Sequence, residues 1–250
     1  MVFSLSDSSV RGILLDIEGT VAPIDFVYQV LFPFAREHLN AYLRANAASE
    51  ELSRDLSLLR EEHQKDLAEK LGPPAWAEKP FDAQIESIQR YVFWLMDRDR
   101  KSTGLKSLQG KIWEQGYLRG QLKAEIYSDV APVLARWKEK STDVRIFSSG
   151  SVLAQKLLFA HTKYGDLTEF LGGFFDTTVG PKLSAQSYHR IAEQFHRSAS
   201  QILFVSDVTA ELDAAKSAGM QTLLFIRPGN PAQPHQHNHS SITNFSEIVD

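Results

Sequence analysis

Residues 12–20 have the sequence GILLDIEGT. The apolar run in this stretch, Ile13-Leu14-Leu15, is followed at once by acidic and turn-forming residues. Continuous Ile and Leu without polar alternation is typical of a strand that is buried on both faces of a parallel sheet. Three later runs have the same character: Val144–Phe147, Ile202–Val205 and Thr222–Ile226. Because segments of helical length separate these later runs, the sequence predicts an α/β fold in which right-handed crossovers join the strands of an open parallel sheet.

Residues 24–124 depart from this alternation of strands and helices. Apolar residues recur there at helical spacing, as in Phe81, Ile85, Ile88, Val92 and Leu95, whereas no convincing strand is present. About a hundred residues of helix are too many for a simple connection between neighbouring strands. We therefore expect an α/β core of residues 9–23 and 125–250, interrupted after the first strand by a helical domain of residues 24–124.

Composition narrows the class of protein. The 250 residues are 43% hydrophobic and 23% charged, and 27 Lys and Arg against 31 Asp and Glu give a net charge of −4. Such a chain is expected to be globular, with no basic surface for nucleic acid. The absence of cysteine excludes disulfides and thiolate chemistry and suits the cytoplasm, with the nucleus an alternative in a eukaryote. Neither a signal peptide nor a run of about 20 apolar residues is recognised, so we expect no membrane partner.

Acidic residues follow two of the predicted strands: Asp16 and Glu18 the first, and Asp207 the third. Ligands of open parallel sheets bind beyond the carboxyl ends of the strands, so these side chains are expected to converge. Carboxylates from separate strands repel one another unless a cation lies between them, and oxygen ligands favour Mg²⁺. The alternative interpretation is structural, with Asp16 in a strand-ending turn and Asp207 as a helix N-cap.

Two further segments complete the candidate site. Ser148 and Ser149 lie between a predicted strand and a predicted helix, where hydroxyls and amides are placed to hold an anion; helix capping by Ser151 is the alternative. Lys182 follows Gly180-Pro181, a rigid turn that could direct the ammonium toward the carboxylates, although exposed lysine is the common case.

The segment 229–241 contains alternate histidines, His235, His237 and His239. Alternate histidines could bind a metal, but this segment is polar and contains proline, and it offers no acidic partner. We therefore predict an exposed loop.

The segments LLDIEGT, IFSSGS, GPKLS and LFVSDVTAE occur in this order and resemble the four motifs of the haloacid dehalogenase superfamily. Longer stretches, including LLDIEGTVAPIDFVYQVLFPFARE, SSGSVLAQKLLF and FIRPGN, are similar to the enolase-phosphatase (acireductone synthase) family of methionine salvage. The resemblance covers nearly the whole chain. It implies a Rossmann-like core with an inserted helical cap. The implied activity is conversion of 2,3-diketo-5-methylthiopentyl-1-phosphate to 1,2-dihydroxy-3-keto-5-methylthiopentene and phosphate by a monomer with one Mg²⁺ per subunit.

The same resemblance implies roles for individual residues. Asp16 would be the nucleophile that accepts the phosphoryl group, and Lys182 would balance negative charge. Ser148 and Ser149 would bind phosphoryl oxygens. The expected metal ligands are Asp16, Glu18 and Asp207. Three roles stay open for Glu18: acid/base in phosphoryl transfer, participation in the enolisation, and binding of Mg²⁺ chiefly through its backbone carbonyl. Most superfamily phosphatases have Asp at the position of Glu18, an acid/base residue, whereas glutamate agrees with the enolase-phosphatase pattern.

Three rival interpretations stay open at this point. Another small-molecule phosphatase of the superfamily would share every core residue and differ in the helical domain. A haloacid dehalogenase would use an Asp nucleophile but would not need the metal carboxylate. A binding protein without catalysis would have no physical reason to keep mutually repelling buried carboxylates.

Overall fold

The computed structural model describes residues 2–6, 8–100, 102–233 and 237–249, and the chain divides into two compact units. Unit 1 comprises Met1–Val27 and Lys123–Asp250, and unit 2 comprises Tyr28–Leu122. The helical insertion expected at 24–124 therefore begins four residues before unit 2 and ends two residues after it.

Unit 1 is built on a six-stranded sheet in which every neighbouring pair of strands is parallel. The strand order is β4-β3-β2-β5-β6-β7. The bounds are β2 Gly12–Leu15, β3 Asp143–Phe147, β4 Gly173–Phe175, β5 Ile202–Ser206, β6 Gln221–Phe225 and β7 Ser240–Ile242. The four predicted strands are confirmed as β2, β3, β5 and β6. The sequence prediction missed β4 and β7, which have three residues each and no apolar run longer than the two phenylalanines of β4.

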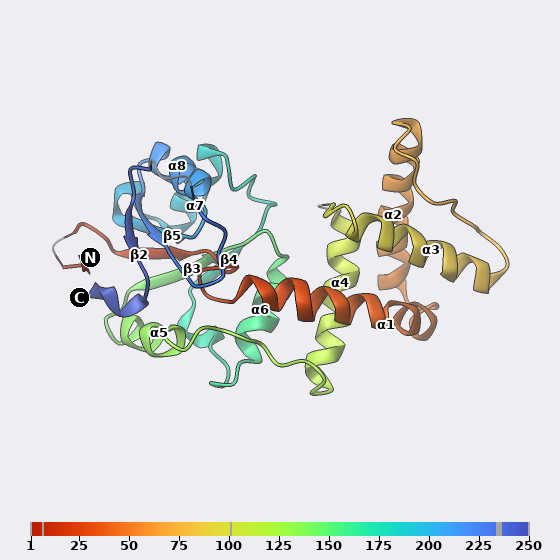
Figure 1. The fold of residues 1–250 in the computed structure, drawn as a ribbon, viewed down its shortest axis with the longest axis horizontal. Helices are drawn as coiled ribbons and strands as arrows, with labels where there is room; N and C mark the ends of the chain where they lie inside the picture. Colours follow the sequence, from red (N-terminus) through yellow and green to blue (C-terminus); the bar gives the residue numbers. More distant parts are fainter. Residues whose placement is uncertain (1, 7, 101, 234–236, 250) are drawn as a thin grey trace. The chain divides into compact units, whose positions relative to one another are not determined.

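Helices cover both faces of this sheet. Figure 1 shows α5 (Val130–Glu139) and α6 (Val152–Ala160) on one face, and α7 (Ala185–Phe195) and α8 (Thr209–Ser217) on the other. The face under α7 and α8 forms a core cluster that includes Leu14, Tyr188, Phe204 and Leu212. These buried apolar contacts fix the strands in register, and the register in turn places the residues at the strand ends.

Strand β2 is the topological switch point of the sheet. The chain passes from β2 to β3 and β4 on one side, and β5, β6 and β7 extend the sheet on the other. A crevice forms at such a point beyond the carboxyl ends of the strands. The residues after β2, β3 and β5 therefore meet there.

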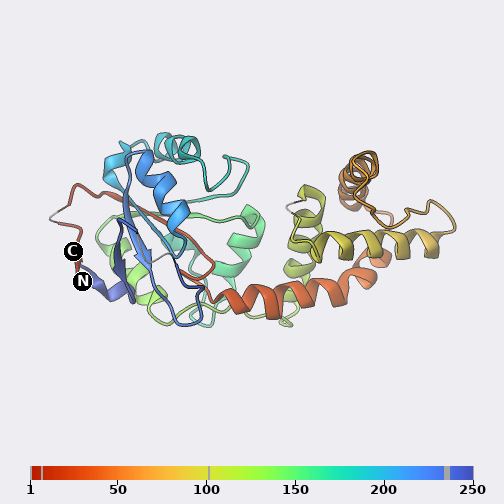
Figure 2. The ribbon, with the colours of Figure 1, turned by 45° about the horizontal axis from the view of Figure 1, so that its top comes forward.

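The remaining short elements of unit 1 bring its termini together. Strand β1 (Phe3–Ser4) pairs with β8 (Ile248–Val249), and both chain ends lie side by side in Figures 1 and 2. The 3₁₀ turns are η2 (Thr168–Phe170), η3 (Ala199–Gln201) and η4 (Phe245–Glu247).

Unit 2 consists of helices. A π-helical segment, η1 (Phe26–Leu31), leads into α1 (Phe32–Ala45), α2 (Glu50–Ala68), α3 (Phe81–Met96) and α4 (Thr103–Leu118). The predicted apolar face of α3 is confirmed because four of its five residues are buried, while Phe81 is 48% exposed. Helices α2 and α4 pack closely at Gly104, where a Cβ atom would lie 2.8 Å from Leu59 Cγ. In the described parts of the chain, no helix has both the length and the apolar character needed to cross a membrane.

The segment 229–241 is exposed or partly exposed over most of its described residues, as predicted, but His239 is an exception. His239 is 7% exposed; its Nδ1 lies 2.8 Å from Thr222 Oγ1 and its Nε2 3.0 Å from Asp213 Oδ1. The prediction was wrong for His239 because the chain there leads into β7 and packs against the edge of the sheet. His235 lies outside the described residues. Among the residues that the structure describes, no group of three or more His, Asp or Glu side chains is placed to hold a metal ion.

Candidate active site

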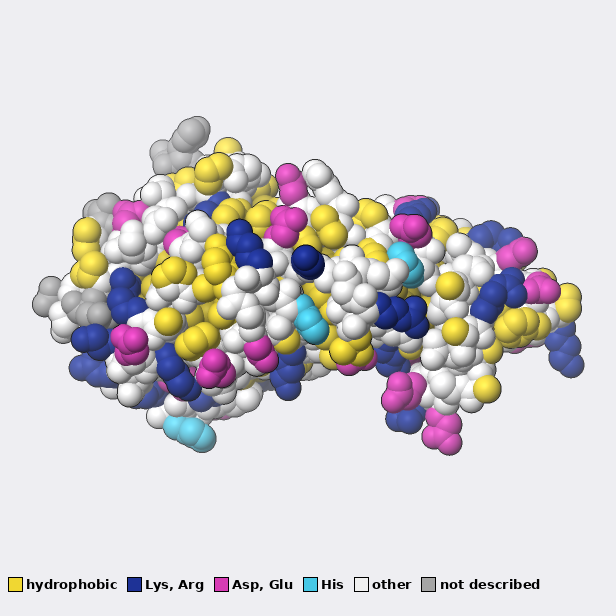
Figure 3. Space-filling model, turned by 90° about the horizontal axis from the view of Figure 1, so that it is seen from below, with side chains coloured by type: hydrophobic (Ala, Val, Ile, Leu, Met, Phe, Trp, Pro, Cys, Tyr) yellow, Lys and Arg dark blue, Asp and Glu magenta, His cyan; other side chains and the backbone are white. Residues whose placement is uncertain are grey.

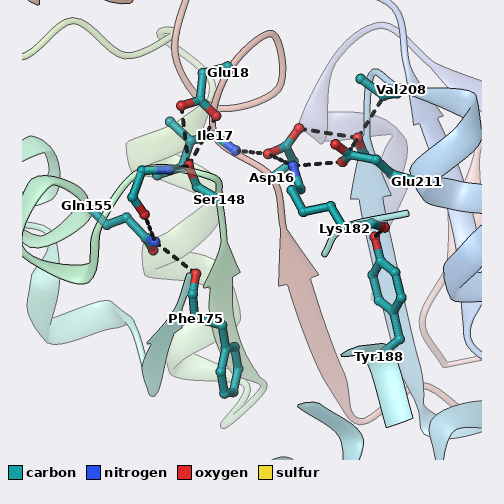
Figure 4. Close-up of polar contacts among 12 residues, drawn as sticks. Asp16, Ile17, Glu18, Ser148, Gln155, Phe175, Lys182, Tyr188, Val208 and Glu211 are labelled. Atoms are coloured by element: carbon teal, nitrogen blue, oxygen red, sulfur yellow. Dashed lines mark hydrogen bonds and ion pairs between the residues drawn. The ribbon is translucent and has the colours of Figure 1, made fainter. Parts of the chain in front are cut away.

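Asp16 directly follows β2 and is 2% exposed. Its Oδ1 accepts hydrogen bonds from Lys182 Nζ at 2.6 Å and from the Ile17 amide at 2.8 Å. Its Oδ2 lies 3.2 Å from Ser206 Oγ. Contacts to both oxygens fix the carboxylate in one orientation at the carboxyl edge of the sheet (Figure 4). A fixed, buried carboxylate beside an ammonium is suited to attack an electrophile that carries negative charge.

Lys182 is held by its own turn. The Tyr188 hydroxyl donates to the Lys182 carbonyl at 2.8 Å, and the Ser187 hydroxyl donates to the Pro181 carbonyl at 2.8 Å. Gly180 has φ +137°, and a Cβ atom there would lie 2.3 Å from Ser187 Oγ, so glycine is required for this turn. The Lys182 side chain is 7% exposed, which excludes the solvated lysine that the sequence left open.

A second carboxylate also contacts this lysine. Glu211, in the first turn of α8, places Oε2 2.7 Å from Lys182 Nζ and 3.1 Å from Ser206 Oγ. Sequence reasoning gave neither Glu211 nor Ser206 a role in the site. The spacing between Asp207 and Glu211, one helical turn, was the signal available for Glu211. For Ser206 the signal was its place as a polar residue at the end of a buried strand.

Asp207 follows β5 and is 3% exposed. Its carboxylate lies against Gly19, where a Cβ atom would be 2.3 Å from Asp207 Oδ2. Gly19 has φ +73°, so this turn needs glycine both for backbone conformation and for the close approach. The N-cap of α8 is Val208, without a side-chain cap. The capping role considered for Asp207 is therefore not observed.

Ser148 differs from its expected role. Its buried hydroxyl lies 3.2 and 3.3 Å from the two Glu18 carboxylate oxygens and accepts a hydrogen bond from the Gly150 amide at 3.0 Å. Figure 4 shows the Glu18 side chain facing Ser148, while Asp16 faces Lys182. Ser149, by contrast, is partly exposed and has no side-chain hydrogen bond within the described residues. Of the two serines, only Ser149 is free to bind an anion without first releasing Glu18.

The electrostatics of the site follow from its excess of carboxylates. Burial, and then the charge of Asp16, raise the pKa of Asp207 from 3.8 to about 7. The same two causes raise the pKa of Glu211 to about 7 and raise the pKa of Glu18. Burial alone would lower the pKa of Lys182, but the surrounding carboxylates outweigh it and raise that pKa. Lys182 therefore carries a positive charge, and the carboxylates of Asp16 and Glu211 both contact it.

A divalent cation fits the oxygen atoms that are left without partners. Among the described residues, no cation pairs with the buried Asp207 carboxylate, and no donor bonds the Glu18 carbonyl oxygen. Hard oxygen ligands of this kind, together with the Asp16 carboxylate, suit Mg²⁺, which takes few protein ligands and completes its shell with water and phosphate oxygens. The expected residues Asp16, Glu18 and Asp207 therefore fit a magnesium site, with Glu18 contributing its carbonyl.

Comparisons with known proteins agree with this fold. The sequence profile of the haloacid dehalogenase-like hydrolases matches residues 10–219. Enolase-phosphatase E1 of Synechococcus elongatus is 51% identical over 89% of this chain and 91% of its own length, and the Enterobacter protein of the same name is 44% identical over 96% of each. The crystal structure of the UTR4 protein of Saccharomyces cerevisiae has a TM-score of 0.76 at 34% identity, covering 95% of this chain and 99% of that one.

The fold and the matched profile define the class of protein, a haloacid dehalogenase-like hydrolase. Identities of 44% and 51% over nearly full length narrow the class further. The chain belongs to the enolase-phosphatase family within these hydrolases, and is an enzyme.

Proposed function

We propose that this chain converts 2,3-diketo-5-methylthiopentyl-1-phosphate to 1,2-dihydroxy-3-keto-5-methylthiopentene and phosphate in methionine salvage. The observation that carries the proposal is the Asp16 carboxylate, fixed at the switch point of the sheet 2.6 Å from Lys182 Nζ. Relatives named enolase-phosphatase E1 support the choice of substrate. The inserted unit 2, Tyr28–Leu122, would be the cap that selects it.

Phosphate release would proceed in two displacements on phosphorus. An Asp16 carboxylate oxygen forms a bond to phosphorus while the bond from phosphorus to the substrate oxygen breaks, giving an aspartyl phosphate and an enol oxygen that takes up a proton. Water then attacks the same phosphorus, the bond to Asp16 breaks, and inorganic phosphate leaves. Glu18 is suited to supply the first proton and to accept one from the water, because burial and the charge of Asp16 raise its pKa above its ordinary value.

Lys182 would neutralise charge during both displacements. Its ammonium contacts Asp16 and Glu211, so it would stabilise the additional negative charge of a bound phosphoryl group. Ser149, and Ser148 once released from Glu18, would donate to phosphoryl oxygens. Positioning and charge neutralisation are the main protein contributions to phosphoryl transfer.

Mg²⁺ is the proposed cofactor, one per subunit, held by the carboxylates of Asp16 and Asp207 and by the carbonyl of Glu18. When bound, it would neutralise phosphoryl charge and polarise a keto oxygen so that the neighbouring C–H bond becomes more acidic. A carboxylate of the site would accept that proton in the enolisation, and the enol would then be the leaving group.

A single assay separates this function from that of another small-molecule phosphatase with the same core. The diketo phosphate is supplied with Mg²⁺, and ultraviolet absorbance of the enol is followed together with inorganic phosphate. A generic phosphate monoester serves as the control substrate. We expect an enol signal, phosphate release, loss of both on chelation, and little release from the monoester. Phosphate from both substrates at similar rates with no enol signal would favour the generic phosphatase.

We also propose that the chain acts as a cytoplasmic monomer without nucleic-acid or membrane partners. The net charge of −4 argues against a nucleic-acid partner, and the absence of cysteine suits the cytoplasm. On the face drawn in Figure 3, acidic and basic side chains are interspersed. Light scattering of the purified chain tests the oligomeric state, and a mass of about twice 28.1 kDa would contradict it.

A further inference from the structure

The turn that follows β6 contacts the loop that carries the nucleophile. The Asn230 amide bonds the Arg227 carbonyl at 3.2 Å, with Pro228 and Gly229 between them. Gly229 has φ +88°, so the four residues have the sequence and the conformation of a type II turn, with proline second and glycine third. A turn of this kind is rigid, and it fixes where the side chains at its two ends begin.

Both end residues of this turn bind backbone carbonyls just after Glu18. Arg227 Nη2 and Nε lie 3.0 and 3.3 Å from the Thr20 carbonyl oxygen, and Asn230 Nδ2 lies 2.9 Å from the Gly19 carbonyl oxygen. The two carbonyls that follow Glu18 are therefore held by the turn, whereas the Glu18 carbonyl itself is left for another ligand.

Arg227 is itself firmly anchored. It is 7% exposed, and its guanidinium pairs with both carboxylate oxygens of Asp129 at 2.9 and 3.1 Å. The guanidinium carbon lies 3.9 Å from the Tyr127 ring centre and 4.0 Å from that of Phe225. A planar, buried arginine held in this way transmits a fixed position to the Thr20 carbonyl.

The same segment also reaches the loop that carries Asp207. Gln233 Oε1 accepts hydrogen bonds from the Thr209 amide at 3.1 Å and from the Thr209 hydroxyl at 3.2 Å. Gly19, in the loop after β2, lies close to both Asp207 and Asn230, because a Cβ atom there would be 2.3 Å from Asp207 Oδ2 and 3.0 Å from Asn230 Nδ2. Residues 227–233 thus bridge the loop after β2 and the loop after β5.

We propose that Arg227, Asn230 and Gln233 form a clamp that sets the separation of the Glu18 carbonyl and the Asp207 carboxylate, and so tunes the affinity of the site for its divalent cation. The three are positioning residues, because they act through Gly19, Thr20 and Thr209. The inference rests on the proposed magnesium site.

The test compares Asn230→Ala and Arg227→Lys with the wild-type chain, using Mg²⁺ alone as the probe in calorimetric titrations. Asn230 is uncharged and partly exposed, so its replacement by alanine leaves no buried charge without a partner. We expect the dissociation constant for Mg²⁺ to rise at least about fivefold in each variant, since either change releases a loop carbonyl. Excess Mg²⁺ should restore the kcat for phosphate release in Asn230→Ala.

Arg145→Lys is the matched control. Arg145 also pairs with an aspartate, Asp143, bonds a backbone carbonyl, that of Gln194, and lies over a ring, that of Phe195. It is the middle residue of β3, and these contacts involve no residue of the candidate site. Its replacement should lower thermal stability without changing Mg²⁺ affinity. Unchanged Mg²⁺ affinity in both clamp variants, beside measurable binding by the wild-type chain, would overturn the clamp. No Mg²⁺ binding by the wild-type chain would overturn the proposed cofactor and the clamp with it.

Discussion

Unit 2 and unit 1 both bury charged side chains, but each buried carboxylate of unit 2 has a cation beside it. On α2, the Asp55 carboxylate lies 2.7 Å from Lys111 Nζ of α4. Asp66, 1% exposed, lies 2.9 Å from Arg100 and accepts a hydrogen bond from the Tyr91 hydroxyl at 2.7 Å. A cation next to each buried carboxylate is the condition for a buried ion pair to be tolerated.

Unit 1 has a paired buried charge in Arg227 and Asp129, but its candidate site leaves buried charges unbalanced. Four carboxylates, those of Asp16, Glu18, Asp207 and Glu211, surround the ammonium of Lys182, which contacts two of them. Burial and the charge of Asp16 raise the pKa of the other three. The comparison teaches that a paired buried charge is tolerated within a fold, whereas an unpaired excess of one sign marks a site that is completed by a cation and a charged substrate.

Asp16→Asn should have the largest effect on the activity of the site in unit 1. The amide keeps the size of the side chain but removes the nucleophile, so phosphate release should fall at least about a thousandfold, which corresponds to roughly 4 kcal/mol. Phosphate release and thermal unfolding are measured on the same preparation. Near-normal turnover would end the covalent mechanism, and a large loss of stability would show that the carboxylate is structural.

Lys182→Ala removes the positive charge of the site. We expect kcat/KM to fall by more than about a hundredfold, or roughly 2.7 kcal/mol of transition-state stabilisation, because the four carboxylates of the site and the substrate then lack their counter-charge. Steady-state kinetics over a range of Mg²⁺ concentrations measure the change. A decrease of less than fivefold would mean that the lysine does not neutralise substrate charge.

Asp55→Asn in unit 2 should lower stability and leave activity unchanged. Loss of the carboxylate leaves Lys111 partly buried and unpaired, so the free energy of unfolding should fall by about 2 kcal/mol. The value of kcat should stay at that of the wild-type chain, because Asp55 makes none of the contacts of the site. Urea unfolding and kinetics at a temperature where the variant is folded give the two numbers. A loss of kcat without a loss of stability would contradict the distinction between the units.

Asp207→Asn should have the smallest effect on stability, and that effect should depend on pH. The pKa of Asp207 is raised from 3.8 to about 7, so the folded chain binds this proton more tightly than the unfolded chain does. Without a divalent cation, stability therefore falls as the pH rises from about 4 to 7.

Asp207→Asn has no carboxylate to deprotonate, so it does not lose stability as the pH rises. At pH 8 in chelator it should be more stable than the wild-type chain by about 1 kcal/mol or more, with no gain at pH 4. Urea unfolding at the two pH values measures the difference. An equal change at both pH values would show that the carboxylate carries no such penalty.

The sequence predicted the part of the fold that is carried by apolar runs. Four continuous runs became β2, β3, β5 and β6, and the spacing of apolar residues predicted α3. Strands β4 and β7 are short, and they pair at the sheet edges through backbone hydrogen bonds, which leave little trace in side-chain pattern. His239 was predicted to be exposed because its partners, Thr222 and Asp213, come from other elements.

The candidate site was predictable wherever a residue follows a strand directly. Asp16, Ser148 and Asp207 do so, and the topology brings their strands together. Orientation was not predictable, because the turn at Gly19 directs Glu18 toward Ser148 rather than alongside Asp16 (Figure 4). The clamp was equally hidden, since Arg227 and Asn230 bond backbone carbonyls about two hundred positions away, and every residue type carries such a carbonyl.

The central claim is that Asp16 carries the phosphoryl group during turnover. The direct measurement is acid quenching of the chain while it turns over the diketo phosphate, followed by borohydride reduction and mass spectrometry of the peptide 12–36. An aspartyl phosphate is reduced to homoserine, so the account predicts homoserine at position 16 in a fraction of the quenched chains and none when substrate is omitted. Homoserine at another position, or phosphate released through a complete single turnover with position 16 unmodified at every time, would contradict it.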